Sequence, residues 1–125
     1  MEQNQFYFSR IRTFFKSCFD KDLPLCTASI TIEEYCVYPL SNNNEKSVEN
    51  FNMFIKGMNI EVVPVSREIA FAVAKIRAKY KTFKALDSIH LATAKLLECK
   101  KFITNDKQLK QVQEISVFTM DNFAD

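Results

Sequence analysis

The hydrophobic positions of this chain follow two spacings. From Gln5 to Phe19 apolar residues recur as on one helix face, and the polar run at residues 20–22 ends that pattern. Short apolar runs, typical of buried strands, follow at Leu23–Ala28, Ile60–Val65, Phe102–Thr104 and Ile115–Phe118. The pattern therefore predicts four short strands that alternate with helices.

Polar residues and proline indicate where the first two crossover helices begin and end. Ser29 or Thr31 is expected to cap a helix that Pro39 stops, because proline lacks the backbone N–H that a helix interior needs. Residues 47–56 form the next helix, and Gly57 is placed to be its C-terminal cap.

The second half of the chain repeats the alternation. Pro64 removes a ladder donor from its strand and predicts a sheet edge, and Ser66 caps the helix that follows. Asp87 begins a small, apolar helix that runs to Lys100, and Asn105-Asp106 caps a short one. Strands alternating with helices imply βαβ units, so we expect an α/β fold with a parallel sheet flanked by helices.

Composition narrows the class of protein. The 125 residues contain twelve Phe but only one Gly and three Pro, which argues against a turn-rich sandwich or barrel and favours a single domain over residues 1–125. Four scattered cysteines and one histidine make a four-ligand zinc site improbable. The polar N-terminus and the lack of a membrane-length apolar run predict a reduced, cytoplasmic protein with no membrane partner.

Three acids fall at predicted junctions where ligands bind in parallel α/β sheets, namely Glu34, Asp87 and Asp106. Each has a purely structural alternative. Glu34 could complete a capping box with Thr31, Asp87 could be an N-cap, and Asp106 could form an Asx turn after Thr104. If the three converge, their charges repel unless a cation neutralises them, and Mg²⁺ or Mn²⁺ suits such oxygen ligands.

A basic stretch without acids lies just before Asp87. It is either a solvated helix face or a strip that binds the phosphates of RNA, and its cations are Lys75, Arg77, Lys79, Lys81 and Lys84.

Three motifs in this order resemble the PIN domain family. The first is the run from Ser29 to Tyr35, in which alignment on Thr31 selects Glu34. The second, from Arg77 to Ala94, has an Asp before an Ala-rich helix, and the third is the strand end Thr104-Asn105-Asp106. With these motifs in the family's order and at plausible separations, the resemblance covers essentially the whole chain from Phe6 onward.

This resemblance implies a Mg²⁺- or Mn²⁺-dependent endoribonuclease, the VapC-type toxin of a toxin–antitoxin pair. Its expected partners are an RNA substrate, a small antitoxin protein and a second copy of the chain, bound through helices near the N-terminus and residues 47–56. It implies Glu34, Asp87 and Asp106 as metal ligands, and Thr104 as a hydroxyl that orients a ligand or water. Asn105 is a further candidate, and His90, one turn after Asp87, is interpreted as a helix-face residue near the site.

The resemblance has one departure. PIN domains begin with a central strand that ends in an acid, and no such element precedes the first helix here. We therefore expect an incomplete sheet and either a truncated or a degenerate relative. A catalytically silent binding module that pairs with an antitoxin or dimerises is the alternative function. An unrelated α/β domain, whose acids are only caps, is the third.

Overall fold

The computed structural model of the chain describes residues 13–104 and 106–119. The chain divides into two compact units, one formed by Pro24–Thr93 and the other by Met1–Leu23 with Ala94–Asp125. The boundary falls inside a continuous helix.

The described elements alternate as the sequence predicts. A helix over residues 13–20 is followed by β1 (Cys26–Ala28), α2 (Ile30–Ser41), α3 (Glu45–Gly57), β2 (Glu61–Val63), α4 (Arg67–Lys79), α5 (Ala85–Leu96), β3 (Phe102–Thr104), the 3₁₀ helix η1 (Lys107–Gln111) and β4 (Val117–Thr119). No helix in residues 13–104 or 106–119 is long and apolar enough to cross a membrane.

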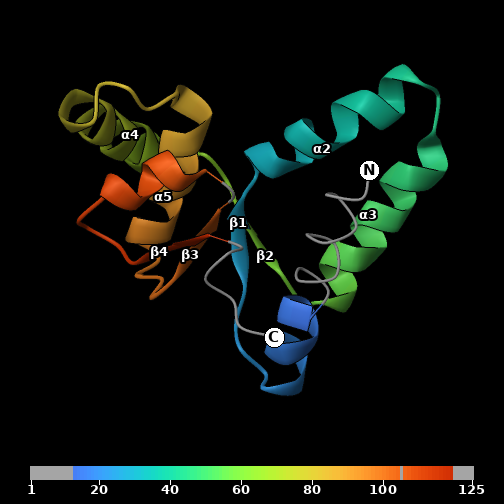
Figure 1. Cartoon of the computed structure of the whole chain (residues 1–125). Coiled ribbons are helices and arrows are strands. Elements are labelled where there is room, and N and C mark those ends of the chain that lie inside the picture. The colour runs from blue at the N-terminus through green and yellow to red at the C-terminus, as the bar shows by residue number, and fades with distance from the viewer. Residues whose placement is uncertain (1–12, 105, 120–125) are drawn as a thin grey trace. The chain divides into compact units, whose positions relative to one another are not determined.

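In the part of the chain that the structure describes, each unit holds one parallel pair of strands (Figure 1). In Pro24–Thr93, β1 pairs with β2, and Thr27 lies opposite Val62. In the other unit β3 pairs with β4, and Ile103 lies opposite Phe118. The α/β class and the parallel pairing of short strands are confirmed, but the described strands form two two-stranded sheets and not the single sheet that the alternation predicts. The strands are three residues each, and β2 ends before Pro64 rather than containing it.

The core of the unit Pro24–Thr93 includes apolar side chains of α4, α5 and the segment that joins them. Ile69 and Ile76 of α4 are buried, as are Leu91 of α5 and Phe83 between these helices. Burying such side chains contributes roughly 1.5–3 kcal/mol each. Ser66 caps α4 as expected, because its Oγ accepts a hydrogen bond from the backbone N–H of Ile69 at 3.2 Å.

The other unit buries Leu109 of η1 and Cys18 of the helix at residues 13–20. Burial raises the pKa of the Cys18 thiol, because it penalises the thiolate, and the positive charges of Lys21 and Lys101 oppose that shift. Cys18 is therefore a small buried hydrophobe rather than a reactive thiol.

Among the residues that the structure describes, four helices are closed just beyond their last turn by a residue other than glycine in the left-handed conformation. For α3 the N–H of Asn59 donates to the carbonyl of Lys56 at 3.1 Å, and the N–H of Ile60 donates to that of Ile55 at 3.0 Å. These two bonds form a Schellman motif. The same pair of bonds closes the other three helices, and the left-handed residues are Asp22 (φ 54°), Asn43 (φ 56°), Asn59 (φ 54°) and Glu98 (φ 55°).

Three expected helix ends are wrong. α5 ends at Leu96 rather than at Lys100, because the N–H groups of Glu98 and Cys99 bond back to the last turn and close the helix there.

Gly57 is the last helical residue of α3 and has no positive φ, because Asn59 takes the left-handed position two residues later. Pro39 lies inside α2, which continues to Ser41. A proline in the last turn removes only one donor, and its carbonyl still accepts the N–H of Asn44 at 2.8 Å, so the helix can close beyond it.

Candidate functional site

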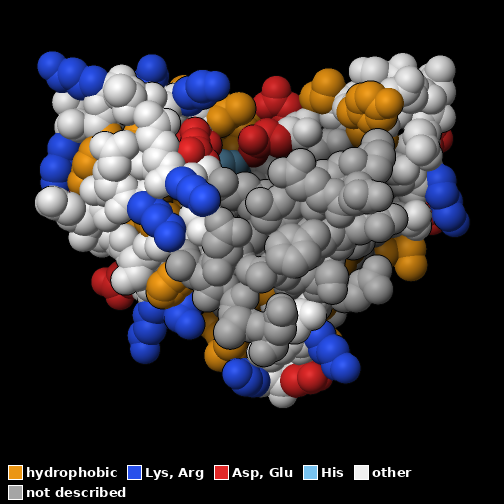
Figure 2. Space-filling view, viewed as in Figure 1, with side chains coloured by type: hydrophobic (Ala, Val, Ile, Leu, Met, Phe, Trp, Pro, Cys, Tyr) orange, Lys and Arg blue, Asp and Glu red, His pale blue; other side chains and the backbone are white. Residues whose placement is uncertain are grey.

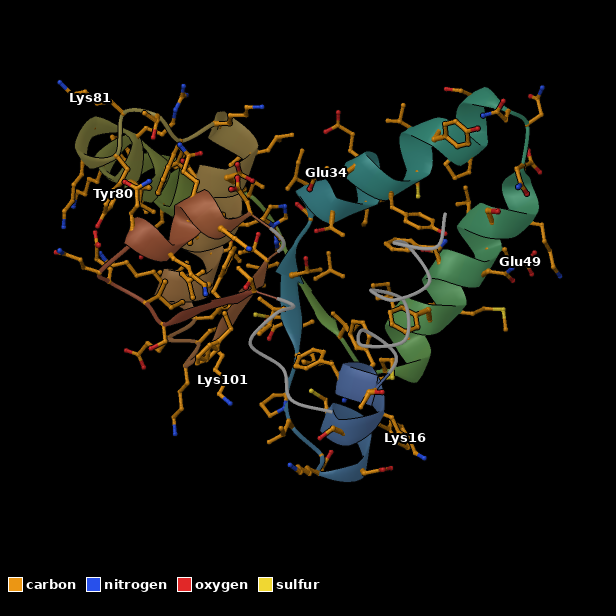
Figure 3. The ribbon with its side chains drawn as sticks, in the orientation of Figure 1. Lys16, Glu34, Glu49, Tyr80, Lys81 and Lys101 are labelled. Atoms are coloured by element: carbon orange, nitrogen blue, oxygen red, sulfur yellow. The ribbon has the colours of Figure 1, made fainter. Side chains whose placement is uncertain are left out.

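Glu34 lies near the start of α2, at the carboxyl end of the β1–β2 pair. The N–H of Ser29 donates to the carbonyl of Val63 at 2.8 Å, so the ladder continues up to the residue before the helix. The glutamate therefore lies where parallel sheets bind ligands. Figure 3 shows it on the first part of α2, and its side chain is 40% exposed.

The Glu34 carboxylate makes a long-range hydrogen bond. Its Oε1 lies 2.7 Å from Nε2 of His90 on α5. The capping-box alternative for Glu34 is wrong among the described residues, because α2 already begins at Ile30 and Thr31 lies inside it. The Thr31 hydroxyl instead contacts that of Thr27 at 2.6 Å, which joins the first turn of α2 to β1.

Asp87 is the third residue of α5, not its N-cap. The helix begins at Ala85, and the N–H of Ser88 donates to the carbonyl of Lys84 at 3.1 Å. The Asp87 side chain is therefore not needed to cap the helix, and it is half-buried. His90 follows one turn later on the same face. Figure 2 shows the single histidine next to acidic side chains.

Asp106 and Thr104 come together in the other unit through local bonds. The Asp106 carboxylate accepts the N–H of Gln108 at 2.9 Å and caps η1, and the Thr104 hydroxyl accepts the N–H of Asp106 at 3.1 Å. The structural alternative for Asp106 is thus confirmed. It uses Oδ1 and leaves Oδ2 without a partner among the described residues. Asn105 lies outside the described residues.

The candidate acids suit a hard cation in chemistry. Mg²⁺ takes oxygen ligands and commonly uses only one or two carboxylates together with waters. Glu34 and Asp87 supply such oxygens within one unit, and Glu34 is exposed enough to share them with water. Residues 13–104 and 106–119 contain no cluster of three or more His, Cys, Asp or Glu side chains that could hold a metal ion.

The basic stretch is exposed but does not form one helix face. α4 ends at Lys79, so Lys81 and Lys84 lie beyond that helix. Within α4, Lys75 and Lys79 share a face at i, i+4, whereas Arg77 points about 200° away from either. The Lys79 ammonium lies 5.3 Å from the centre of the Tyr80 ring, which itself stacks on Phe83. Figure 3 shows Lys81 projecting outward after α4.

Comparisons with known proteins identify the family of the chain. The family model for the PIN domain matches residues 9–115. The chain belongs to the PIN domain family. A solved structure described as a toxin-antitoxin complex from Klebsiella pneumoniae is similar to this PIN domain, with a TM-score of 0.65 and 25% sequence identity over 84% of this chain and 82% of that chain. No curated protein matched the chain.

The sequence did not identify two polar contacts of this PIN domain. The bond between His90 and Glu34 joins residues 56 positions apart, and the hydroxyl pair of Thr27 and Thr31 joins a strand to a helix. For the bond between His90 and Glu34, the one feature of the sequence that pointed to it was the spacing of Asp87 and His90, which places both on one face of α5.

Proposed function

We propose that this PIN-domain protein is a Mg²⁺- or Mn²⁺-dependent endoribonuclease and the toxin of a toxin–antitoxin pair. The observation that carries the proposal is the placement of Glu34 and Asp87 in a chain of this family. Glu34 follows a parallel strand, and its bond to His90 ties it to the helix that carries Asp87. The similarity to a toxin–antitoxin structure supports the biological role.

In this proposal the carboxylates hold the cation and the neighbouring groups fix the carboxylates. Glu34 offers Oε2, because Oε1 is bonded to His90, and Asp87 offers the oxygens of its half-buried carboxylate. Asp106 is proposed as a further cation ligand through Oδ2, and Thr104 orients Asp106 by accepting its N–H. When bound, Mg²⁺ or Mn²⁺ polarises a phosphoryl oxygen and activates water.

RNA is proposed to contact the exposed cations through its phosphates. Lys75 and Lys79 form the most regular pair, because they share one face of α4. Arg77, Lys81 and Lys84 would contact phosphates on either side of that face. Such contacts position a polyanion without reading its sequence, so they favour backbone binding over base recognition.

For the protein partners, we propose a small antitoxin and a second copy of the chain. α2 exposes Tyr38 and Val37, and α3 exposes Met53, although such residues are usually buried. Exposed apolar side chains on consecutive helices are typical of protein interfaces. We assign the second copy to the α3 side, and we propose that residues 1–125 act as one PIN domain.

The test is Mn²⁺-dependent cleavage of a structured RNA by the purified chain, with Asp87→Asn and Lys95→Gln prepared in parallel. We expect cleavage by the parent and by the Lys95 variant, which alters an exposed residue of the same helix, and loss of cleavage by Asp87→Asn. Equal cleavage by the parent and Asp87→Asn, with unchanged Mn²⁺ binding, would contradict the assignment.

A catalytically silent binding module is the second candidate. The observation that favours it is the lack of a three-ligand metal cluster in residues 13–104 and 106–119. This candidate predicts a stable complex with an antitoxin protein and no RNA cleavage at any Mn²⁺ concentration. The cleavage assay therefore separates the two functions.

A further inference from the structure

The hydrogen bond between His90 and Glu34 has a defined direction. A carboxylate oxygen can only accept, so Nε2 of His90 carries the proton and donates it to Oε1 over 2.7 Å. The imidazole side chain is 21% exposed and the glutamate 40% exposed. His90, the donor, is therefore the more buried of the two side chains, and its hydrogen bond restrains the more exposed Glu34.

This bond removes freedom from the glutamate. With Oε1 fixed, the side chain can no longer sample its rotamers independently, and Oε2 is the oxygen left to face a ligand. Bonds from a donor to an ionised acceptor are shorter and stronger than neutral ones. A long, exposed side chain such as Glu34 gains most from such a restraint, because it has several torsions to fix.

α5 carries two functional groups on one face. Asp87 and His90 are one turn apart, so both side chains point to the same side of the helix. The helix that supplies one candidate ligand thus also supplies the group that orients the other, which lies on α2.

We propose that His90 is a positioning residue that orients Glu34 for cation binding, an inference that rests on the proposed metal-dependent function. Hydrogen-bond partners of metal ligands fix ligand orientation, and their loss typically lowers metal affinity about 10–100-fold. His90 does not contact the cation or the RNA in this proposal.

The alternative is that the bond only ties α5 to α2. Two amide variants separate these roles. His90→Gln places an amide nitrogen at about the depth of Nε2, whereas His90→Asn places it at the depth of Nδ1 and falls short of Glu34. The two variants share the same chemistry and differ in reach, so a difference between them reports the hydrogen bond rather than the loss of the ring.

The measurement is Mn²⁺ binding to the purified chain without RNA, from the electron paramagnetic resonance signal of free Mn²⁺. We expect His90→Asn to bind about 10–100-fold more weakly than the parent and His90→Gln to recover most of that loss. Thermal melting of the same samples reports whether each variant is folded. Asp87→Asn serves as the ligand control, and Lys95→Gln as the surface control.

The outcomes separate this inference from the proposed function. If Asp87→Asn loses Mn²⁺ while His90→Asn binds like the parent, the metal site stands and the positioning role is wrong. If both amide variants lose affinity equally and melt earlier, His90 is only a structural tie. A parent that binds no Mn²⁺ would overturn the metal site and the role of His90 together.

A measurement on the unmodified chain covers the case in which the variants do not fold. The imidazole nitrogens of His90 can be assigned by nuclear magnetic resonance in a Mg²⁺ titration. We expect the proton on Nε2 without Mg²⁺, and saturable shifts of the His90 signals as Mg²⁺ is added. A proton on Nδ1, or signals that Mg²⁺ does not move, would contradict the inference.

Discussion

Glu34 in the unit Pro24–Thr93 and Asp106 in the other unit both follow closely on a parallel strand, yet their hydrogen bonds differ. Glu34 bonds to a side chain 56 residues away, whereas Asp106 bonds to the backbone two residues on. The local bond is one that the residue type makes wherever a helix follows. A long-range bond forms only when the fold brings two elements together. Glu34 is thus held by tertiary structure and Asp106 by its neighbours in sequence.

The helix ends of the two units differ in a related way. Pro24–Thr93 places Asn43 and Asn59 at its left-handed positions, and the other unit places Asp22 and Glu98 there. Asn and Asp tolerate this conformation better than other non-glycine residues, while the left-handed region costs an ordinary residue about 1–2 kcal/mol. The unit with Glu98 therefore carries backbone strain that the Asn-capped helices avoid.

Neutralising Glu34 or Asp106 should give the largest effect on RNA cleavage. The two variants test directly whether both acids are cation ligands. Glu34→Gln and Asp106→Asn each remove a charge with little change of shape, and Asn caps a helix about as well as Asp. If each acid is a cation ligand that cleavage requires, cleavage falls about a hundredfold or more in each variant, because a bound cation would stabilise the transition state by several kcal/mol. The measurement is the cleavage rate at saturating Mn²⁺.

The two cleavage rates are also informative if only one of them falls. Loss of cleavage in Glu34→Gln but not in Asp106→Asn would restrict the site to the unit Pro24–Thr93 and leave Asp106 as a cap alone. Melting temperatures near that of the parent serve as the control, since neither substitution should remove a structural hydrogen bond.

The second largest expected effect is a loss of stability when the core of either unit is truncated. Leu91 and Leu109 are each 1% exposed, one in each unit. Leu91→Ala and Leu109→Ala should each lower the free energy of unfolding by about 2–5 kcal/mol, measured in urea. Hydrogen exchange should show the loss of protection mainly in the unit that carries the substitution. Equal loss in both units for either variant would show that the cores open together.

The sequence predicted the elements better than their ends. The strand Phe102–Thr104 and the cap at Ser66 are confirmed because both depend on local pattern and residue type. Gly57 was expected to be left-handed because glycine is the commonest residue there, but the backbone bonds close the helix on Asn59. The end of a helix depends on which carbonyls find donors, and composition does not show that.

For the candidate site, too, the sequence predicted positions and local bonds but not long-range contacts. The positions of Glu34 and Asp87 follow from the order of strands and helices, and the local bonds of Asp106 follow from its residue type. The partner of Glu34 did not follow, since nothing near His90 in sequence indicates α2. A capping box was the best local interpretation of Thr31 and Glu34. It is wrong because α2 begins one residue before Thr31.

The smallest expected effect concerns the left-handed residues. Replacing Glu98 with Gly relieves a backbone cost of about 1–2 kcal/mol but adds about 0.5–1 kcal/mol of chain entropy to the unfolded state, so we expect a net gain of up to about 1.5 kcal/mol. Asn59→Gly relieves less strain for the same entropy and should be close to neutral. Thermal melts of the two variants with the parent measure the difference. A larger gain for Asn59→Gly would mean that Asn is the more strained residue, which contradicts the contrast between the units.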